Sequence, residues 1–120
     1  MITTTVLNWK QPDHFGKLYN HWKHFTQYTA ENGNSIYTIG NRLVTKEEGN
    51  KEFIDIVSKY EHETTRSSSD KNDDEIIEGL KSSIDPWTMM IDDYTQMKEA
   101  EAHNDAIYAI LSAFREAAGK

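Results

Sequence analysis

The spacing of apolar side chains constrains the fold of this 120-residue chain more than any other feature. Between residues 15 and 28, aromatic and apolar positions recur at intervals of three and four, the period of one face of an α-helix. Pro12 and Asp13 stand where such a helix would begin, and Gly33 stands where its C-terminal cap would lie. The pattern therefore predicts an amphipathic helix over residues 13–31. Its apolar face would comprise Phe15, Leu18, Tyr19, Trp22, Phe25 and Tyr28.

Three short regions have the composition of β-strands instead. Residues 2–7 are β-branched and apolar, which favours a strand. Residues 35–39 and 42–45 are β-prone runs separated by Gly40-Asn41, an arrangement typical of a hairpin with a two-residue turn. An isolated hairpin is marginally stable in water, so we expect the first strand or a helix to pack against it.

The chain between residues 45 and 84 predicts two further helices. Thr45 and Glu48 have the spacing of a capping box ahead of a stripe that ends near Tyr60, although the helix can also begin near residue 50. A shorter helix follows Asp73 or Asp74, either of which can cap it. Its inward-facing positions would be Ile76, Ile77, Leu80 and Ile84.

A long C-terminal helix is expected over residues 86–118. Asp85-Pro86 is a typical start, with an acidic N-cap followed by proline in the first turn. One apolar stripe runs from Trp87 to Met97, and a second runs from Ile107 to Phe114. The polar stretch 98–105 between them is either spanned by one continuous helix or broken near Asn104. Its alanines favour continuity.

Residues 64–74 contain no apolar side chain, which predicts a flexible linker. It would separate an α+β N-terminal part, residues 1–63, from a helical C-terminal part, residues 75–118. At this length we expect both parts to belong to a single domain, 1–120. The expected fold class is α+β and mostly helical: an N-terminal strand and a β-hairpin with helices, then a helical C-terminal half.

Composition bears on the assembly and the compartment. The apolar fraction of 37% is low for a globular domain, so a partner or a second copy would supply part of the burial, and a homodimer is as well supported as a monomer. The chain has no cysteine, which excludes disulfides and thiolate chemistry. Its beginning does not have the pattern of a signal peptide, and no apolar run has the length of a membrane span. We expect a cytoplasmic protein.

Charge is distributed unevenly along the chain, whose net charge is −7. Residues 1–30 carry three lysines against one aspartate, whereas residues 61–105 carry thirteen carboxylates against four basic side chains. An acidic chain is a poor ligand for nucleic acid and for anionic membranes. The asymmetry favours a basic protein partner for the acidic segment.

Two groups of side chains have the types found in metal sites. On the predicted helix 13–31, His21 and His24 would lie one turn apart, so both could reach one metal with a third ligand such as His62 or His103. The favoured interpretation is that these histidines belong to a solvated polar face beside the aromatic stripe. No cofactor is expected.

The second group consists of acidic pairs in the C-terminal half. Glu75 and Glu78 form an E-x-x-E pair, and Glu101 and Asp105 lie four residues apart on the predicted long helix. Acidic pairs on two facing helices resemble the arrangement in the all-α nucleoside-triphosphate pyrophosphatases. That resemblance implies magnesium bound over a phosphate ester. The spacing of Glu101 and Asp105 departs from the E-x-x-D of those enzymes.

We therefore expect a non-enzymatic protein-binding domain. Its composition is similar to that of small acidic inhibitors encoded by phages and mobile elements, which act on host defence or nucleic-acid-processing proteins. Trp9 lies outside every periodic stripe. Either it packs over the end of the predicted helix 13–31, which is the favoured interpretation, or it is exposed and serves as an interface anchor. The alternatives are a metal-dependent nucleotide hydrolase and a self-assembling structural subunit. The expected partner-binding residues are Trp9, Asp73, Asp74, Glu75, Glu78, Asp92, Asp93, Glu99 and Glu101.

Overall fold

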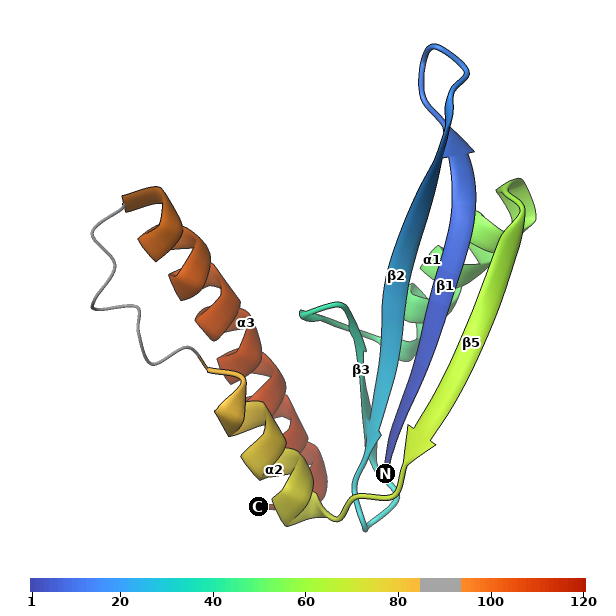
Figure 1. The fold of residues 1–120 in the computed structure, drawn as a ribbon. Coiled ribbons are helices and arrows are strands. Elements are labelled where there is room, and N and C mark those ends of the chain that lie inside the picture. Colours follow the sequence, from blue (N-terminus) through green and yellow to red (C-terminus); the bar gives the residue numbers. More distant parts are fainter. Residues whose placement is uncertain (85–93) are drawn as a thin grey trace.

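A five-stranded antiparallel sheet is the centre of the molecule, with helices on both of its faces (Figure 1). The computed structural model describes residues 1–84 and 94–120. The strand order across the sheet is β4-β3-β2-β1-β5. The elements are β1 (Ile2–Pro12), β2 (Leu18–Thr29), β3 (Ser35–Ile39), β4 (Arg42–Val44), α1 (Lys46–Lys59), β5 (His62–Ser69), α2 (Asp73–Ser82) and α3 (Tyr94–Ala118).

The expectation of a mostly helical chain was wrong, because the predicted helix 13–31 is a turn followed by strand β2. β2 pairs with β1 along its whole length, from Ile2 opposite Tyr28 to Pro12 opposite Leu18. The spacing of the aromatic residues fits a helix, but the segment is rich in aromatic residues and contains two threonines, and both types favour strands. The segment forms a strand because its backbone pairs with β1 on one side and, from Phe25 onward, with β3 on the other.

The linker expected at 64–74 was also wrong for its first half, which belongs to β5. β5 pairs with β1 from Trp9 opposite His62 to Ile2 opposite Ser69. All eight residues of β5 are exposed, so the strand buries no side chain and shows no apolar alternation. Backbone hydrogen bonds to β1 place it at the edge of the sheet.

Several local predictions are confirmed. The strand over 2–7 is the first part of β1, and the hairpin over 35–45 is β3 and β4 with Gly40-Asn41 at the turn. Gly40 has a φ of 60°, a conformation that glycine adopts without steric cost. Helix α1 begins at Lys46 because the capping box of Thr45 and Glu48 forms, with both hydrogen bonds present.

Helices α2 and α3 are close to expectation in the described residues. Asn72 caps α2, rather than Asp73 or Asp74, and Glu75 completes a second capping box. α3 is continuous from Tyr94 to Ala118, so the polar stretch 98–105 does not break it. The predicted start at Asp85-Pro86 lies outside the described residues.

Alternate side chains of the strands enter two separate cores, because neighbouring residues of a strand point to opposite faces. On one face, Leu7 and Trp9 pack against Ile56 of α1, with Phe25 and Phe53 at the edge of this cluster. Phe25 and Phe53 meet edge to face, with ring centroids 5.3 Å apart. This smaller core fixes α1 on the sheet.

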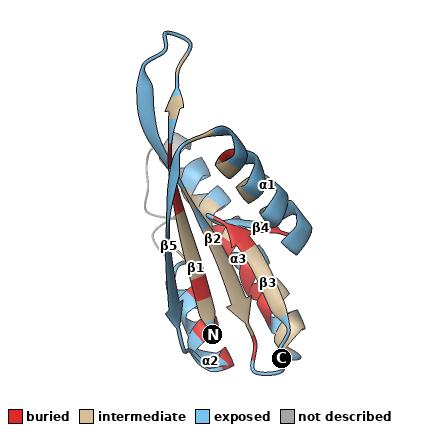
Figure 2. Ribbon diagram, turned by 90° about the vertical axis from the view of Figure 1, so that its right-hand side faces the viewer, coloured by how far each residue is buried: buried red, intermediate tan, exposed pale blue. Residues whose placement is uncertain are grey.

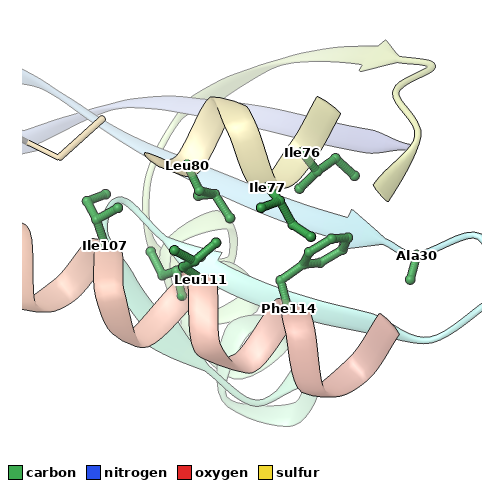
Figure 3. Close-up of a cluster of buried hydrophobic side chains, with 8 residues drawn as sticks. Ala30, Ile76, Ile77, Leu80, Ile107, Leu111 and Phe114 are labelled. Carbon is green, nitrogen blue, oxygen red and sulfur yellow. The ribbon is translucent and has the colours of Figure 1, made fainter. Parts of the chain in front are cut away.

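The larger core lies on the opposite face, between the sheet and the helices α2 and α3 (Figure 3). Phe114 is fully buried, and Ile76 and Ile110 are only 1% and 2% exposed. Tyr28 of β2 packs against this cluster, and its burial raises the pKa of its phenol above the ordinary value. The remaining members are Ala30, Ile77, Leu80, Ile107 and Leu111.

Polar contacts join the β2–β3 turn to the start of α2 and to the end of α3, beside this larger core. We call the larger core and these three segments the base. The side-chain amides of Asn32 and Asn34, in the β2–β3 turn, both donate to the carbonyl of Ala117, at 2.8 and 2.9 Å. They satisfy a carbonyl at the end of α3 that has no partner within the helix. Figure 2 shows buried residues concentrated along the lower sheet and its helices, whereas the opposite tip of β1 and β2 is mostly exposed.

Candidate functional site

The acidic residues expected to bind a partner have several different roles. Asp73 is buried, accepts the backbone N–H of Glu31 at 2.9 Å and lies 3.7 Å from the ammonium of Lys120. It joins the start of α2 to the β2–β3 turn. Asp73 therefore belongs to the structure of the base and is not available to a partner.

The other expected acidic residues are spread over α2 and α3. Glu75 is held in the capping box of α2. Three more lie near basic side chains: Asp74 is 3.4 Å from Lys120, Glu78 is 3.5 Å from Lys81, and Glu101 is 3.9 Å from Lys98. Glu99 is exposed on α3. Asp92 and Asp93 lie outside the described residues.

The candidate metal ligands do not come together in the described part of the chain. His21 and His24 lie on β2, three residues apart, so their side chains point to opposite faces of the strand. The geometry that would have let both reach one ion belonged to the predicted helix. Among residues 1–84 and 94–120, no group of three histidine or acidic side chains is arranged to hold a metal, and this includes Glu101 and Asp105.

Trp9 is buried in the α1-side core, so of the two alternatives it is packed and is not an exposed anchor. Its side chain is 7% exposed, its ring stacks on His21 at 5.5 Å, and its indole N–H donates to the Gln11 side chain at 3.1 Å. Its position before Pro12, in a stretch without apparent period, suggested a loop. The extension of β1 to residue 12 places it on an inward-facing strand position instead.

A protruding hairpin is the feature that sequence reasoning missed. β5 accompanies β1 only as far as Trp9, and β3 accompanies β2 only from Phe25 onward. Beyond these points β1 and β2 continue as a pair and extend from the sheet (Figure 1). We call residues 10–22 the arm.

The tip of the arm is an ordered turn. Asp13 accepts the backbone N–H groups of Phe15 and Lys17 on its carboxylate, at 2.8 and 3.0 Å. Its own N–H donates to the Lys17 carbonyl at 2.9 Å, and Gly16 supplies the positive φ of 81° that the turn requires. The turn uses the charge of Asp13 for its own hydrogen bonds and holds Phe15 out at the end.

Large apolar side chains are exposed along the arm. Phe15 is 85% exposed, Trp22 62%, Leu18 59% and Tyr19 47%. Leu18 and Trp22 share one face of β2, and Tyr19 lies on the other. These four are half of the eight exposed large hydrophobic side chains in the described residues. The signal was present in the sequence, since the aromatic positions follow a turn sequence, Pro12 to Gly16, that would suit a hairpin.

Basic groups lie beside these apolar side chains. The ammonium of Lys17 is 5.5 Å from the centre of the Tyr19 ring, and the rings of His14 and Phe15 are 4.4 Å apart. Lys10 and Lys17 form no ion pair with the described part of the chain. The arm therefore has a net positive charge, two lysines against one aspartate, in a protein whose net charge is −7.

An ion-pair network joins the root of the arm to α1. Glu52 of α1 accepts hydrogen bonds from Lys23 of β2 and from Arg42 of β4, the second at 2.7 Å. The Lys23 ammonium and the Arg42 guanidinium together hold the pKa of the Glu52 carboxyl below its ordinary value. This network orients β2 just before it leaves the sheet.

Comparisons with known proteins give no family for this chain. No family model, no curated protein and no solved structure matches it. Among the described helices, none combines the length and the apolar character needed to cross a membrane.

Proposed function

We propose that this chain acts by binding another protein, and that the arm is its main contact surface. The observation that carries the proposal is the exposure of Phe15, Leu18, Tyr19 and Trp22 on one protruding element. Clustered exposed aromatic side chains are unusual on a monomer's surface and are common at the centre of protein interfaces.

The chemistry of the arm indicates what the partner presents. Its aromatic rings need apolar pockets that remove them from water, and its unpaired lysines favour carboxylates around those pockets. The ordered turn at Asp13 lowers the conformational cost of binding, because the tip is already arranged. A partner with an acidic, apolar groove fits these features.

The test is affinity capture from lysate of the native host with three versions of the protein as bait. They are the wild type, the arm variant Phe15→Ser with Trp22→Ser, and the control Tyr108→Ser. Tyr108 is 53% exposed on α3, so the control substitution removes an exposed aromatic side chain away from the arm. We expect a protein retained by the wild type and the control but lost from the arm variant, with weaker retention at high salt. The same proteins on all three baits would contradict the proposal.

A second candidate uses the acidic helices instead of the arm. In the described residues, α2 and α3 with the segments after them carry eight carboxylates against four basic side chains. A basic partner surface that normally holds nucleic acid would be blocked by such a face. This is the inhibitor function expected from the composition. If this second candidate is right, the double variant Asp74→Lys with Glu99→Lys would no longer capture the partner in the same experiment. The arm variant would still capture it.

The remaining expectations stay predictions. The absence of cysteine is compatible with a reducing compartment, and a cytoplasmic location stays a prediction. A homodimer would be detected by sedimentation equilibrium over a range of concentrations. If the arm mediates it, the variant Phe15→Ser with Trp22→Ser would be monomeric under conditions where the wild type is not.

A further inference from the structure

A groove lies on the α1-side face of the sheet, beyond the part of that face that α1 covers. Its volume is about 410 Å³, within the range of small-molecule sites. The strand register forms its floor: Thr5 lies opposite Phe25, which lies opposite Ile39. In the next row Thr3 lies opposite Gln27, and Gln27 lies opposite Tyr37.

Two elements form the walls of this groove. The first turns of α1 contribute Lys46 and Phe53, and the edge strand β5 contributes Thr64 and Arg66. Arg66 is opposite Thr5 in the β1–β5 register, so its side chain stands on the same face as the floor. The α1 wall therefore carries an aromatic ring and a lysine, and the β5 wall carries a threonine and an arginine.

The charge of the groove differs from that of the whole protein. No aspartate or glutamate lines it, although the chain carries twenty acidic residues. Lys46 and Arg66 form no ion pair with any described residue, and the hydroxyls of Thr5, Tyr37 and Thr64 make no side-chain hydrogen bond there. Five polar groups that suit an anion thus have no side-chain partner among residues 1–84 and 94–120, and three of them, Lys46, Thr64 and Arg66, are exposed to water.

We propose that this groove binds a small organic anion, a planar aromatic ring carrying a phosphate or carboxylate group. The ring would lie against Phe25 and Phe53, whose edge-to-face pair offers an aromatic surface. The anionic group would lie toward Arg66, whose guanidinium binds carboxylate and phosphate in a fork of two hydrogen bonds. This inference is independent of the arm, which extends from the other end of the same strands.

The test is a titration of the uniformly labelled protein followed by amide chemical shifts, with three probes. Phenyl phosphate and benzoate each combine a ring with an anion, and inorganic phosphate supplies the charge alone. We expect saturable shifts at Thr5, Phe25 and Arg66 with one or both aromatic anions, at dissociation constants of about 1 mM or below. The stronger of the two identifies the acidic group.

One variant in the groove and one control outside it complete the design. Arg66→Gln should weaken binding of the aromatic anion about tenfold, because it removes a charge-assisted pair of hydrogen bonds. Lys51→Gln is the matched control, since Lys51 is an exposed lysine of α1 that does not line the groove. The unchanged amide spectrum outside the groove reports that both variants are folded.

Three results would overturn the proposal. The first is the absence of saturable shifts in the groove with either aromatic anion. The second is equal binding by the wild type and Arg66→Gln. The third is a response to inorganic phosphate as strong as to phenyl phosphate, which would indicate an adventitious ion only.

Discussion

The base of the molecule and the arm are built on the same two strands, β1 and β2, and use them in opposite ways. At the base, Tyr28 packs on a core whose central residue, Phe114, is fully buried, and backbone and side-chain hydrogen bonds close the edges. Along the arm, Trp22 and Phe15 are exposed to water. The residues that stabilise the fold are therefore not the ones exposed on the arm, so we expect substitutions on the arm to leave the core intact.

Truncation of Phe114, at the centre of the larger core, should have the largest effect on the free energy of unfolding. We expect Phe114→Ala to lower the free energy of unfolding by about 3–5 kcal/mol, since it leaves a cavity in the larger core. Denaturant unfolding followed by circular dichroism measures this loss. A change below about 1 kcal/mol would mean that the base does not depend on this core.

Removing a polar contact of the base should have the second-largest effect on the free energy of unfolding. We expect Asp73→Ala to cost about 2 kcal/mol, because it removes the charged acceptor of the Glu31 N–H and the neighbour of Lys120. Asp74→Ala is the control, since its side chain is 84% exposed, and it should change stability by less than about 0.5 kcal/mol. Equal effects of the two substitutions would show that burial of Asp73 does not matter.

The network at the root of the arm should give a smaller, pH-dependent effect. The pKa of Glu52 is lower in the folded protein, so its ionised form is favoured by folding. The stabilisation is present above the unfolded pKa and is lost as the pH falls through the folded pKa. Glu52→Gln should cost about 1 kcal/mol at neutral pH and progressively less below about pH 4.

The control for this network is Glu47→Gln, which removes a carboxylate of α1 that forms no ion pair in the described part of the chain. Unfolding midpoints near neutral pH and near pH 3 compare the variants with the wild type. A stability difference for Glu52→Gln that stays constant between the two would refute the role of its charge.

The smallest effect on stability should come from the arm itself. We expect Phe15→Ser with Trp22→Ser to change the free energy of unfolding by no more than about 0.5 kcal/mol, because both side chains are already exposed to water. Trp9→Ala, at a buried position of the same hairpin, should cost several times more. Thermal unfolding of both variants makes the comparison, and a large loss from the arm variant would mean that the arm packs on the body.

The parts of the fold that were predictable are those defined by local chemistry. The turn at Gly40-Asn41 and the capping box of Thr45 and Glu48 each depend on a few neighbouring residues, and both formed. The continuity of α3 through residues 98–105 followed from helix propensity. In these cases the sequence pattern and the tertiary structure favoured the same conformation.

The parts that were not predictable depend on pairing between distant residues. The positions from Phe15 to Tyr28 fit the helical period, and only the strands on both sides make β2 a strand. β5 carries no apolar side chain at all, so nothing in residues 62–69 alone distinguishes an edge strand from a loop. The turn from Pro12 to Gly16 hinted at a hairpin, but the protrusion of the arm depends on the β1–β2 pairing extending past β5 and β3, which no local pattern gives.

The path of the chain from β4 to β5 has a consequence for the timing of folding during synthesis. β1 is made first, but its second neighbour, β5, is made only after the chain has passed through α1 to the opposite edge. The core around Phe114 is completed later still. At ~5–20 residues per second, the β1–β2 hairpin waits on the order of ten seconds for that core. During this interval the side chains of β1 and β2 that will enter the larger core lack the helices that later cover them.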